Sequence, residues 1–331
     1  GPGPGRGAGR PWRGPREPLH AGGGGGRGQA VARLRRWLAA EAALPLQDGS
    51  RSQLLLHGKP TGKGTVVLFH GWSSGTYQYD QLAPKLHELG FDVFVPRLPG
   101  HGFKTAAGVA DPAYLPRAGE SHRYRAYADE VMGLVSGLGG PVRVAGLSGG
   151  ANVALDIRNR YPVAGVVAMA PYLAAADNRA RLGHHAVAFL DRLSFGQASR
   201  VLDLIKHDWG KRSGSVAAGH WHHTVGNIYA VSRNGDRVVS ELRRSGPPIQ
   251  FITTASDRAA SNDVIARAYR RAGGPAANGW YQFPLEEAVP HPMLSPVTNP
   301  KQASIERLND TIAQFFDTGR LTDRGVAPGP R

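Results

Sequence analysis

The sequence predicts an α/β protein in which a mostly parallel sheet carries helices on both faces. Short apolar runs rich in β-branched residues, typical of buried strands, alternate along the chain with segments of helical periodicity. Glycine-rich turns follow two of these runs directly, and the ligand site of a parallel sheet lies beyond the carboxyl ends of its strands. We expect one such domain over residues 31–331, preceded by an unstructured segment of residues 1–30.

That first segment is rich in glycine, proline and arginine and has no hydrophobic period, so it cannot bury enough apolar surface to fold. Residues 1–36 carry eight arginines and one acidic residue, within a formal net charge of +15 for the chain. A basic arm for nucleic acid or anionic membrane is the alternative reading. The arm lacks regular aromatic interleaving, and we expect no nucleic-acid partner.

The remaining composition excludes several classes of protein. The chain has no cysteine, which excludes disulfides, thiol catalysis and cysteine-ligated zinc. No apolar run reaches the roughly 18–20 residues that span a bilayer.

The first half of the chain alternates as a parallel sheet requires. An amphipathic docking helix over 29–43 precedes an edge strand within 50–57. Thr65–Phe69 is a buried strand, and the helix after it bears Leu82 and Leu86 and stops at Gly90. A strand over 92–96 and a helix over 122–138 follow.

The second half repeats the alternation with one interruption. Strands are expected over 142–146, 163–169, 249–254 and 280–283, and helices from 153, over 262–271 and over 300–316. Between them, residues 173–246 show helical periodicity and loops rich in glycine, histidine and tryptophan. We interpret this stretch as a mostly helical insertion, a lid that covers the strand ends. The tail from Thr318 is polar and is expected to be loose.

A Gly-x-Ser-x-Gly sequence, residues 146–150, lies between the strand over 142–146 and the helix that follows. A serine on such a sharp turn has its hydroxyl exposed, and glycines are needed where a Cβ would clash. The helix points its free N–H groups at the serine. Ser148 is therefore the candidate nucleophile, although a glycine-rich turn without chemistry is the plainer reading of the motif alone.

A serine hydroxyl needs a base and a group that orients the base. Asp257 follows the strand over 249–254 and is the candidate acid, with Asp263, expected near the start of the next helix, as its rival. His291 lies in the loop after the next strand, between Pro290 and Pro292. It is the only histidine after His223, and we expect it to be the base.

An oxyanion hole needs two backbone N–H donors. Gly149 follows the nucleophile, and Trp72 lies in the loop after the strand that ends at Phe69. We expect substrate to contact Trp72, whose indole can wall an acyl pocket, together with His70 and Leu147 at the same strand ends. His101, in the Pro-Gly-His-Gly sequence over 99–102, precedes the nucleophile and is expected to brace its loop.

The insertion is rich in histidine, with His184, His185, His207, His220, His222 and His223. Imidazole clusters can bind zinc, but no acid stands at a ligand spacing here, and adjacent histidines rarely face one metal. We predict no metal and interpret these side chains as lid surface or pocket lining.

Together these motifs resemble the α/β-hydrolase superfamily, and most of all serine esterases of the bacterial carboxylesterase and monoglyceride-lipase type. The resemblance rests on residues 68–72, 96–102 and 146–150 with Asp257 and His291, and it covers roughly residues 50–316. It implies an eight-stranded, mostly parallel sheet, a helical lid, no cofactor and a small-molecule ester as substrate. Ser148 at the sharp turn disfavours those members of the superfamily that have aspartate as the nucleophile at this position.

Three alternatives remain at this point. The same triad could cleave an amide, a thioester or a carbon–carbon bond, or transfer an acyl group, since fold and triad do not separate these reactions. The fold could serve as a non-catalytic binding protein, against which the intact set of Ser148, Asp257 and His291 argues. The third is the basic nucleic-acid arm.

Overall fold

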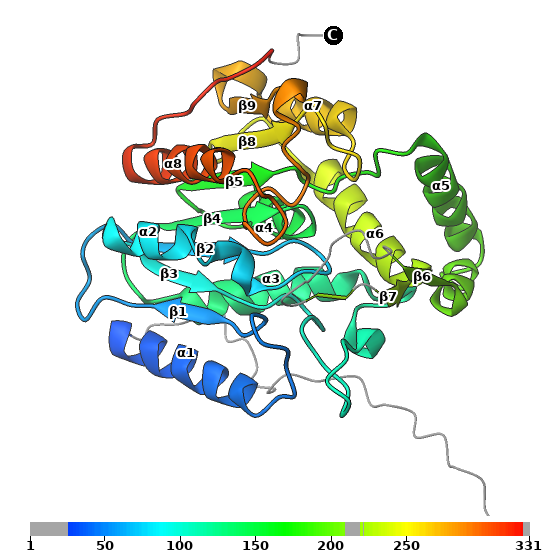
Figure 1. Ribbon diagram of the computed structural model, residues 1–331, viewed down its shortest axis with the longest axis horizontal. Helices are drawn as coiled ribbons and strands as arrows, with labels where there is room; N and C mark the ends of the chain where they lie inside the picture. The colour runs from blue at the N-terminus through cyan, green and yellow to red at the C-terminus, as the bar shows by residue number, and fades with distance from the viewer. Residues whose placement is uncertain (1–25, 209–218, 221, 327–331) are drawn as a thin grey trace, which may run out of the picture.

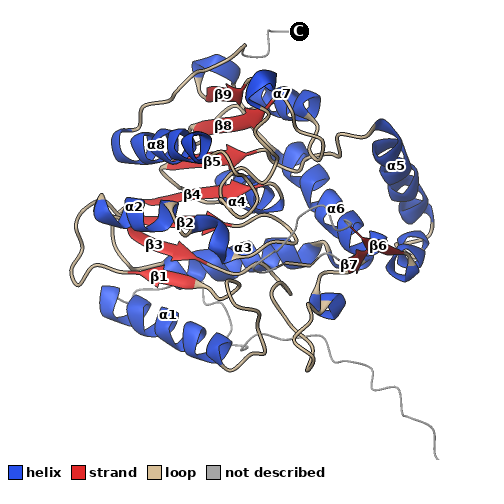
Figure 2. Ribbon diagram, viewed as in Figure 1, coloured by secondary structure: helices blue, strands red, loops and turns tan. Residues whose placement is uncertain are grey.

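The computed structural model describes residues 26–208, 219–220 and 222–326. Its centre is a seven-stranded sheet in the order β1-β3-β2-β4-β5-β8-β9, parallel except for the antiparallel pair of β1 and β3 (Figure 1, Figure 2). The strands are β1 Gln53–Leu55, β2 Thr65–Phe69, β3 Asp92–Val95, β4 Val142–Leu147, β5 Gly165–Met169, β8 Ile249–Thr254 and β9 Gly279–Phe283. The predicted mostly parallel sheet is confirmed, and six of its strands lie within one or two residues of their expected bounds.

The predicted count of eight strands is wrong for the described residues, where the sheet has seven. The chain ahead of β1 is not extended but forms helix α1 (Arg27–Ala42), a segment rich in the strong helix formers alanine, arginine and leucine. Ala30 and Leu34 of this helix are fully buried in the core, which confirms a docking helix. The three-residue strand β1 therefore remains at the edge of the sheet.

Helix α1 also corrects the predicted start of the folded domain. Its first residue, Arg27, falls inside the segment expected to be unstructured, and its guanidinium pairs with Asp92 at 2.5 Å. Residues 1–25, on which the rest of that expectation and the basic-arm alternative depend, lie outside the described residues.

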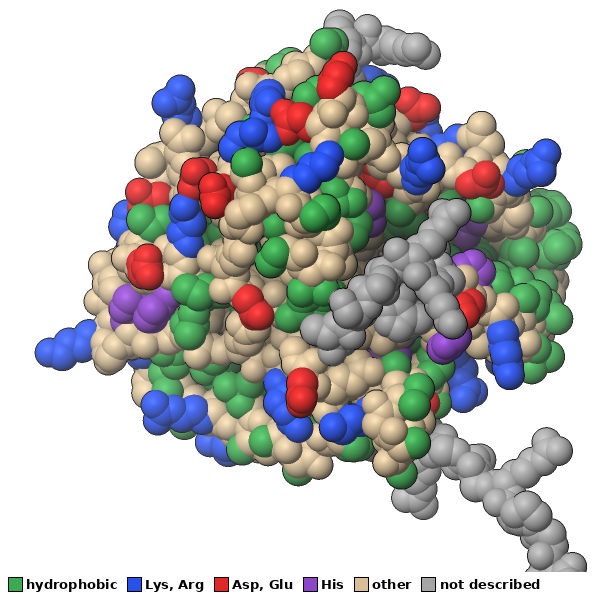
Figure 3. Space-filling model, viewed as in Figure 1, with side chains coloured by type: hydrophobic (Ala, Val, Ile, Leu, Met, Phe, Trp, Pro, Cys, Tyr) green, Lys and Arg blue, Asp and Glu red, His purple; other side chains and the backbone are tan. Residues whose placement is uncertain are grey.

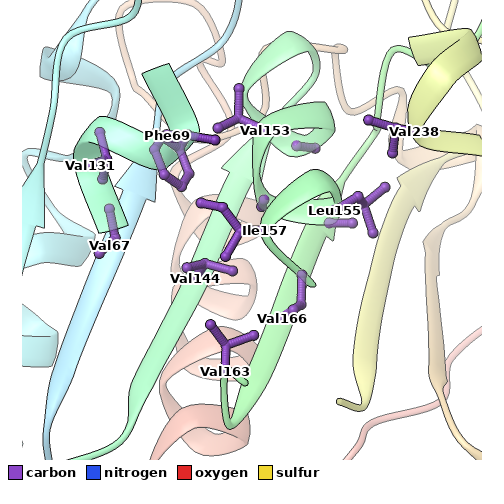
Figure 4. Packing of buried hydrophobic residues seen from close by; sticks show 14 of the residues in the cluster. Val67, Phe69, Val131, Val144, Val153, Leu155, Ile157, Val163, Val166 and Val238 are labelled. Atoms are coloured by element: carbon purple, nitrogen blue, oxygen red, sulfur yellow. The ribbon is translucent and has the colours of Figure 1, made fainter. Parts of the chain in front are cut away.

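Helices cover both faces of the sheet because successive side chains of a buried strand point to opposite sides. In β2, Val67 and Phe69 join one core cluster, and Val66 and Leu68 join the other. Figure 4 shows the first cluster, in which Val67, Phe69, Val144 and Val166 of the strands meet Val131, Val153 and Ile157 of the helices.

Helices α1, α3 (His122–Val135), α4 (Gly149–Arg160) and α7 (Asn262–Arg271) contribute to the first cluster. Helices α2 (Leu82–Glu88) and α8 (Gln302–Thr318) contribute to the second. Short 3₁₀ helices cover Thr76–Tyr79, Pro112–Tyr114, Ala118–Glu120, Ala198–Leu204, Gly274–Ala276 and Leu285–Glu287. None of the helices in the described residues is long and apolar enough to cross a membrane.

The insertion between β5 and β8 contains helix α5 (Asn178–Leu193), the 3₁₀ helix Ala198–Leu204 and helix α6 (Val225–Glu241). It also contains a small antiparallel pair, β6 (Lys206–Asp208) with β7 (His222–Thr224), which the sequence did not predict. Helix α6 packs against α4, whereas α5 stands away from the sheet (Figure 1). That this insertion works as a lid remains a prediction.

Helix α5 turns its apolar side chains outward. Leu182 is 72% exposed and Leu193 65%, and Phe195 just beyond the helix is 93% exposed. The helical periodicity of the sequence predicted a helix here, but Ala188 alone among the residues of α5 is buried. Apolar side chains consequently gather on the surface where α5 lies, at the right of Figure 3.

The tail is ordered further than expected. The carbonyl of Arg324 accepts the N–H of Gln282, and the carboxylate of Asp323 accepts the N–H of Trp280 at 2.9 Å. Residues 322–324 thus cover the open edge of β9, where unpaired backbone groups would otherwise face solvent.

Candidate active site

Ser148 stands on the turn from β4 to α4 with φ 56° and ψ −119°, a conformation that L-residues rarely adopt. The turn leaves no room for side chains around it. A Cβ on Gly146 would lie 2.2 Å from the carbonyl oxygen of Gly150, and one on Gly150 would lie 2.3 Å from the carbonyl oxygen of His70. The backbone N–H of Ser148 is fixed by the carbonyl of Met169 at 2.8 Å. The glycines of the motif are therefore demanded by space.

A continuous chain of hydrogen bonds joins the three residues expected to form a triad. Nε2 of His291 is 2.8 Å from Oγ of Ser148, and its Nδ1 is 2.7 Å from Oδ2 of Asp257. The three come from loops at the carboxyl ends of β4, β8 and β9. The imidazole retains 17% exposure, whereas the Asp257 side chain is fully buried. A proton can thus pass from the hydroxyl to the imidazole, whose other nitrogen already faces a carboxylate.

The environment of Asp257 favours its charged form. Burial alone would raise its pKa, but the charge of His291 and the hydrogen bonds to Oδ1 from the N–H groups of Ala259 and Ala260, at 2.8 and 2.9 Å, lower the pKa on balance. Its rival Asp263 lies in the first turn of α7, at the place expected for it.

Gly149 and Trp72, the expected oxyanion donors, lie against each other. A Cβ on Gly149 would come 2.8 Å from Cβ of Trp72 and 3.2 Å from Cγ2 of Val231 in α6. The first turn of α4 begins at Gly149, so its free N–H groups lie next to Ser148. Trp72 is half-buried, with the ring of His223 at 4.9 Å from its indole in an edge-on contact.

His70 and Leu147, expected to touch substrate, present no surface to it in this conformation, being 0% and 1% exposed. His70 instead braces the backbone, since its Nδ1 lies 2.8 Å from the carbonyl of Gly71 and its Nε2 accepts the N–H of Leu98 at 3.0 Å. Burial lowers its pKa to about 3. His101 is braced in the same manner, between the N–H of Ser73 and the carbonyl of Pro99.

The histidines of the insertion form pairs and not a metal cage. His184 pairs with Asp236 at 2.7 Å, and His222 with Asp208 at 3.2 Å. In the described part of the chain, no group of three or more potential ligands could hold a metal ion. His223 and His220, by contrast, are buried next to the loop that carries Trp72, a proximity that sequence reasoning anticipated only as pocket lining.

One family model matches most of the chain. It is Hydrolase_4, described as serine aminopeptidase, S33, and it matches residues 60–278. That range includes Ser148 and Asp257 and ends before His291. No curated protein matches the chain.

Several solved structures share the fold. The monoacylglycerol lipase of Paleococcus ferrophilus has a TM-score of 0.58 and 18% identity, over 81% of this chain and 98% of the lipase. A soluble variant of monoglyceride lipase from Saccharomyces cerevisiae, solved with a substrate analogue, has a TM-score of 0.57 and 12% identity, over 82% of this chain and 92% of that lipase. A structure from work on the metagenome-derived lipolytic enzymes LipS and LipT has a TM-score of 0.56 and 17% identity, over 81% of this chain and 99% of the other. The predicted α/β-hydrolase fold is confirmed.

Proposed function

The chain belongs to the serine aminopeptidase S33 family of α/β-hydrolases, and we propose that it hydrolyses carboxylic esters, as the lipases of the same fold do, through Ser148, His291 and Asp257. Ser148 is the nucleophile, His291 the general base, and Asp257 the group that orients the imidazole and stabilises its cation. The substrate is a small-molecule ester.

The distances between these three side chains support a reaction through an acyl-enzyme. Oγ of Ser148 attacks the ester carbonyl while Nε2 of His291, 2.8 Å away, takes its proton. The backbone N–H groups of Trp72 and Gly149 hold the oxyanion of the tetrahedral intermediate. His291 then protonates the leaving alcohol, and the acyl group remains on Ser148. Water, deprotonated by His291, attacks the acyl-enzyme and releases the acid.

The observation that carries this proposal is the hydrogen-bonded chain from Ser148 to Asp257. It joins residues 143 and 34 positions apart in the sequence, and it ends on a carboxylate that is fully buried. A turn with no chemistry has no need of a strained serine in hydrogen-bond reach of an imidazole. The same series of hydrogen bonds argues against a role in ligand binding alone.

The family description names a serine aminopeptidase, so an amide or peptide bond is the second candidate. Both reactions use the same nucleophile, base and oxyanion donors, and pocket shape decides between them. Turnover of aminoacyl p-nitroanilides faster than of p-nitrophenyl esters would assign the chain to amides.

The direct test is hydrolysis of p-nitrophenyl acetate, butyrate, octanoate and palmitate by the wild type and by Ser148→Ala. We expect the variant to lose at least ~10³-fold in kcat. Ser136→Ala, an exposed serine at the end of α3, is the matched control and should retain full activity. A wild type inactive on all four esters, or a Ser148→Ala variant as active as the wild type, would overturn the proposal.

A further inference from the structure

Three histidines from different parts of the chain each hold one of three successive peptide units in the loop after β2. Nδ1 of His70 lies 2.8 Å from the carbonyl of Gly71, in the unit between residues 71 and 72. The N–H of Ser73 donates to Nε2 of His101 at 2.8 Å and holds the next unit. The backbone N–H of His220 donates to the carbonyl of Ser73, also at 2.8 Å, and holds the third. The unit that carries the Trp72 N–H is thus fixed with its two successors.

Their hydrogen bonds require these three rings to be neutral. Each Nε2 accepts a backbone N–H, so the single ring proton sits on Nδ1. The donors to His70, His101 and His220 are Leu98, Ser73 and Gly102, at 3.0, 2.8 and 2.9 Å. Burial holds the pKa of all three below the usual range, to about 3 for His70 and about 4 for His220.

His220 differs from the other two because it belongs to the insertion. It is fully buried, and among the described residues its Nδ1 has no hydrogen-bond partner. A buried donor without an acceptor is costly, so packing alone would favour an apolar side chain here. What the imidazole provides is the acceptor for Gly102, which anchors the backbone of His220 while its N–H reaches Ser73.

The contacts around His220 tie the insertion to the same loop. Its ring centroid lies 5.6 Å from that of His101, edge-on. The N–H of the preceding Gly219 donates to the side chain of Gln47 at 3.0 Å. On the other side, the ring of His223 contacts the Trp72 indole. The position of the insertion and the position of the Trp72 loop are therefore mechanically connected.

We propose that His220 is a positioning residue: by anchoring Ser73, it sets the Trp72 N–H for the oxyanion and makes transition-state stabilisation depend on the seating of the insertion. The inference rests on the proposed function, since it concerns the oxyanion donors of that reaction. Its signature is a loss in kcat with little change in KM, because the ground-state ester does not need a fully aligned donor.

The experiment compares His220→Leu, which removes the acceptor, with His220→Gln, whose side-chain oxygen can accept the Gly102 N–H. His222→Leu is the matched control, because His222 is 71% exposed and directed away from this network toward Asp208. Kinetics are measured on the best p-nitrophenyl ester, below the melting temperature of each variant.

We expect His220→Leu to lower kcat by ~10–100-fold with KM within about threefold, since one misaligned oxyanion donor costs less than its removal. His220→Gln should recover most of the loss, and His222→Leu should match the wild type. A trifluoromethyl ketone bearing the same acyl group forms an oxyanion on Ser148, so its inhibition constant should rise by the same factor as kcat falls. The inhibition constant of the product acid should stay unchanged.

The outcomes separate this inference from the proposed function. If the wild type hydrolyses the ester and Ser148→Ala does not, the proposed function stands. In that case a His220→Leu variant with unchanged kcat, a loss confined to KM, or an equal loss in His222→Leu overturns the positioning role alone. A wild type that neither turns over esters nor binds the trifluoromethyl ketone overturns both.

Discussion

The carboxyl edge of the sheet and the outer part of the insertion treat their side chains in opposite ways. Around the edge, Phe69 and Leu147 are 0% and 1% exposed, and glycines stand where neighbouring backbones leave no room. Along α5, Leu182 and Leu193 are 72% and 65% exposed. Residues at the edge are constrained by their neighbours on all sides. Helix α5 makes few contacts, so its conformation depends mainly on its own helical propensity. Candidate chemistry therefore sits where the positions of atoms are most strongly determined.

The buried histidines at and beside the carboxyl edge give the largest expected effect, on acid stability. Burial lowers the pKa of His70 to about 3 and of His220 and His223 to about 4, from 6.5. Below pH 6.5 the unfolded chain binds protons that the folded chain excludes, so stability is full above pH 6.5 and falls as the pH drops toward 4.

The loss is on the order of 1 kcal/mol per histidine and pH unit. The urea midpoint should therefore fall steeply between pH 7 and pH 5, as followed by circular dichroism. His220→Leu should flatten this fall, because one of the excluded protons is then absent. A midpoint that does not change between pH 7 and pH 5 would mean that these rings are not neutral and buried.

The next effect concerns the edge alone. Asp257→Asn should lower kcat by ~10³–10⁴-fold, because an amide neither holds the required tautomer of His291 nor stabilises its cation. Asp263→Asn, six residues on in the first turn of α7, is the matched control. Asp263 is exposed and its helix-dipole contact affects stability, so kcat should stay within about twofold. Ester hydrolysis kinetics are measured on both variants. Similar losses of kcat in the two would contradict the proposal that Asp257 orients His291.

The smallest expected effect is the difference in unfolding free energy between substitutions in the core and in α5. Leu155→Ala, in the fully buried part of α4, should cost about 2–5 kcal/mol of unfolding free energy, from lost transfer and a cavity. Leu190→Ala, 50% exposed on α5, should stay within about 0.5 kcal/mol of the wild type. Urea unfolding of both variants measures the difference. A Leu190→Ala variant that loses as much as Leu155→Ala would show that α5 is packed in solution.

The sheet was predictable because each of its longer strands has a local sequence pattern typical of buried strands. Thr65–Phe69 and Ile249–Thr254 are continuous apolar or β-branched runs, and the structure gives them the same bounds. The eighth strand was inferred from resemblance, and the helix formers of α1 occupy the chain ahead of β1. The pair β6 and β7 was missed because three-residue strands rich in histidine and charge carry no periodic signal.

The proximity of Ser148, Asp257 and His291 was predictable from chain order and loop position, whereas their catalytic roles stay predictions. The bracing role of His70 was not, because a histidine beside a strand end reads equally well as pocket wall or as backbone acceptor. His220 was harder still, since its partners Ser73 and Gly102 lie more than a hundred residues away. Only the three-dimensional structure joins such segments.

The backbone of Ser148 carries a last consequence. Its φ of 56° with ψ −119° is a conformation that glycine adopts freely and serine adopts at a cost of roughly 1–3 kcal/mol. If Ser148 is the nucleophile, residue 148 is the point where activity and stability oppose each other. Stability alone would favour glycine at this position, so the serine is explained by its hydroxyl and not by the backbone it occupies.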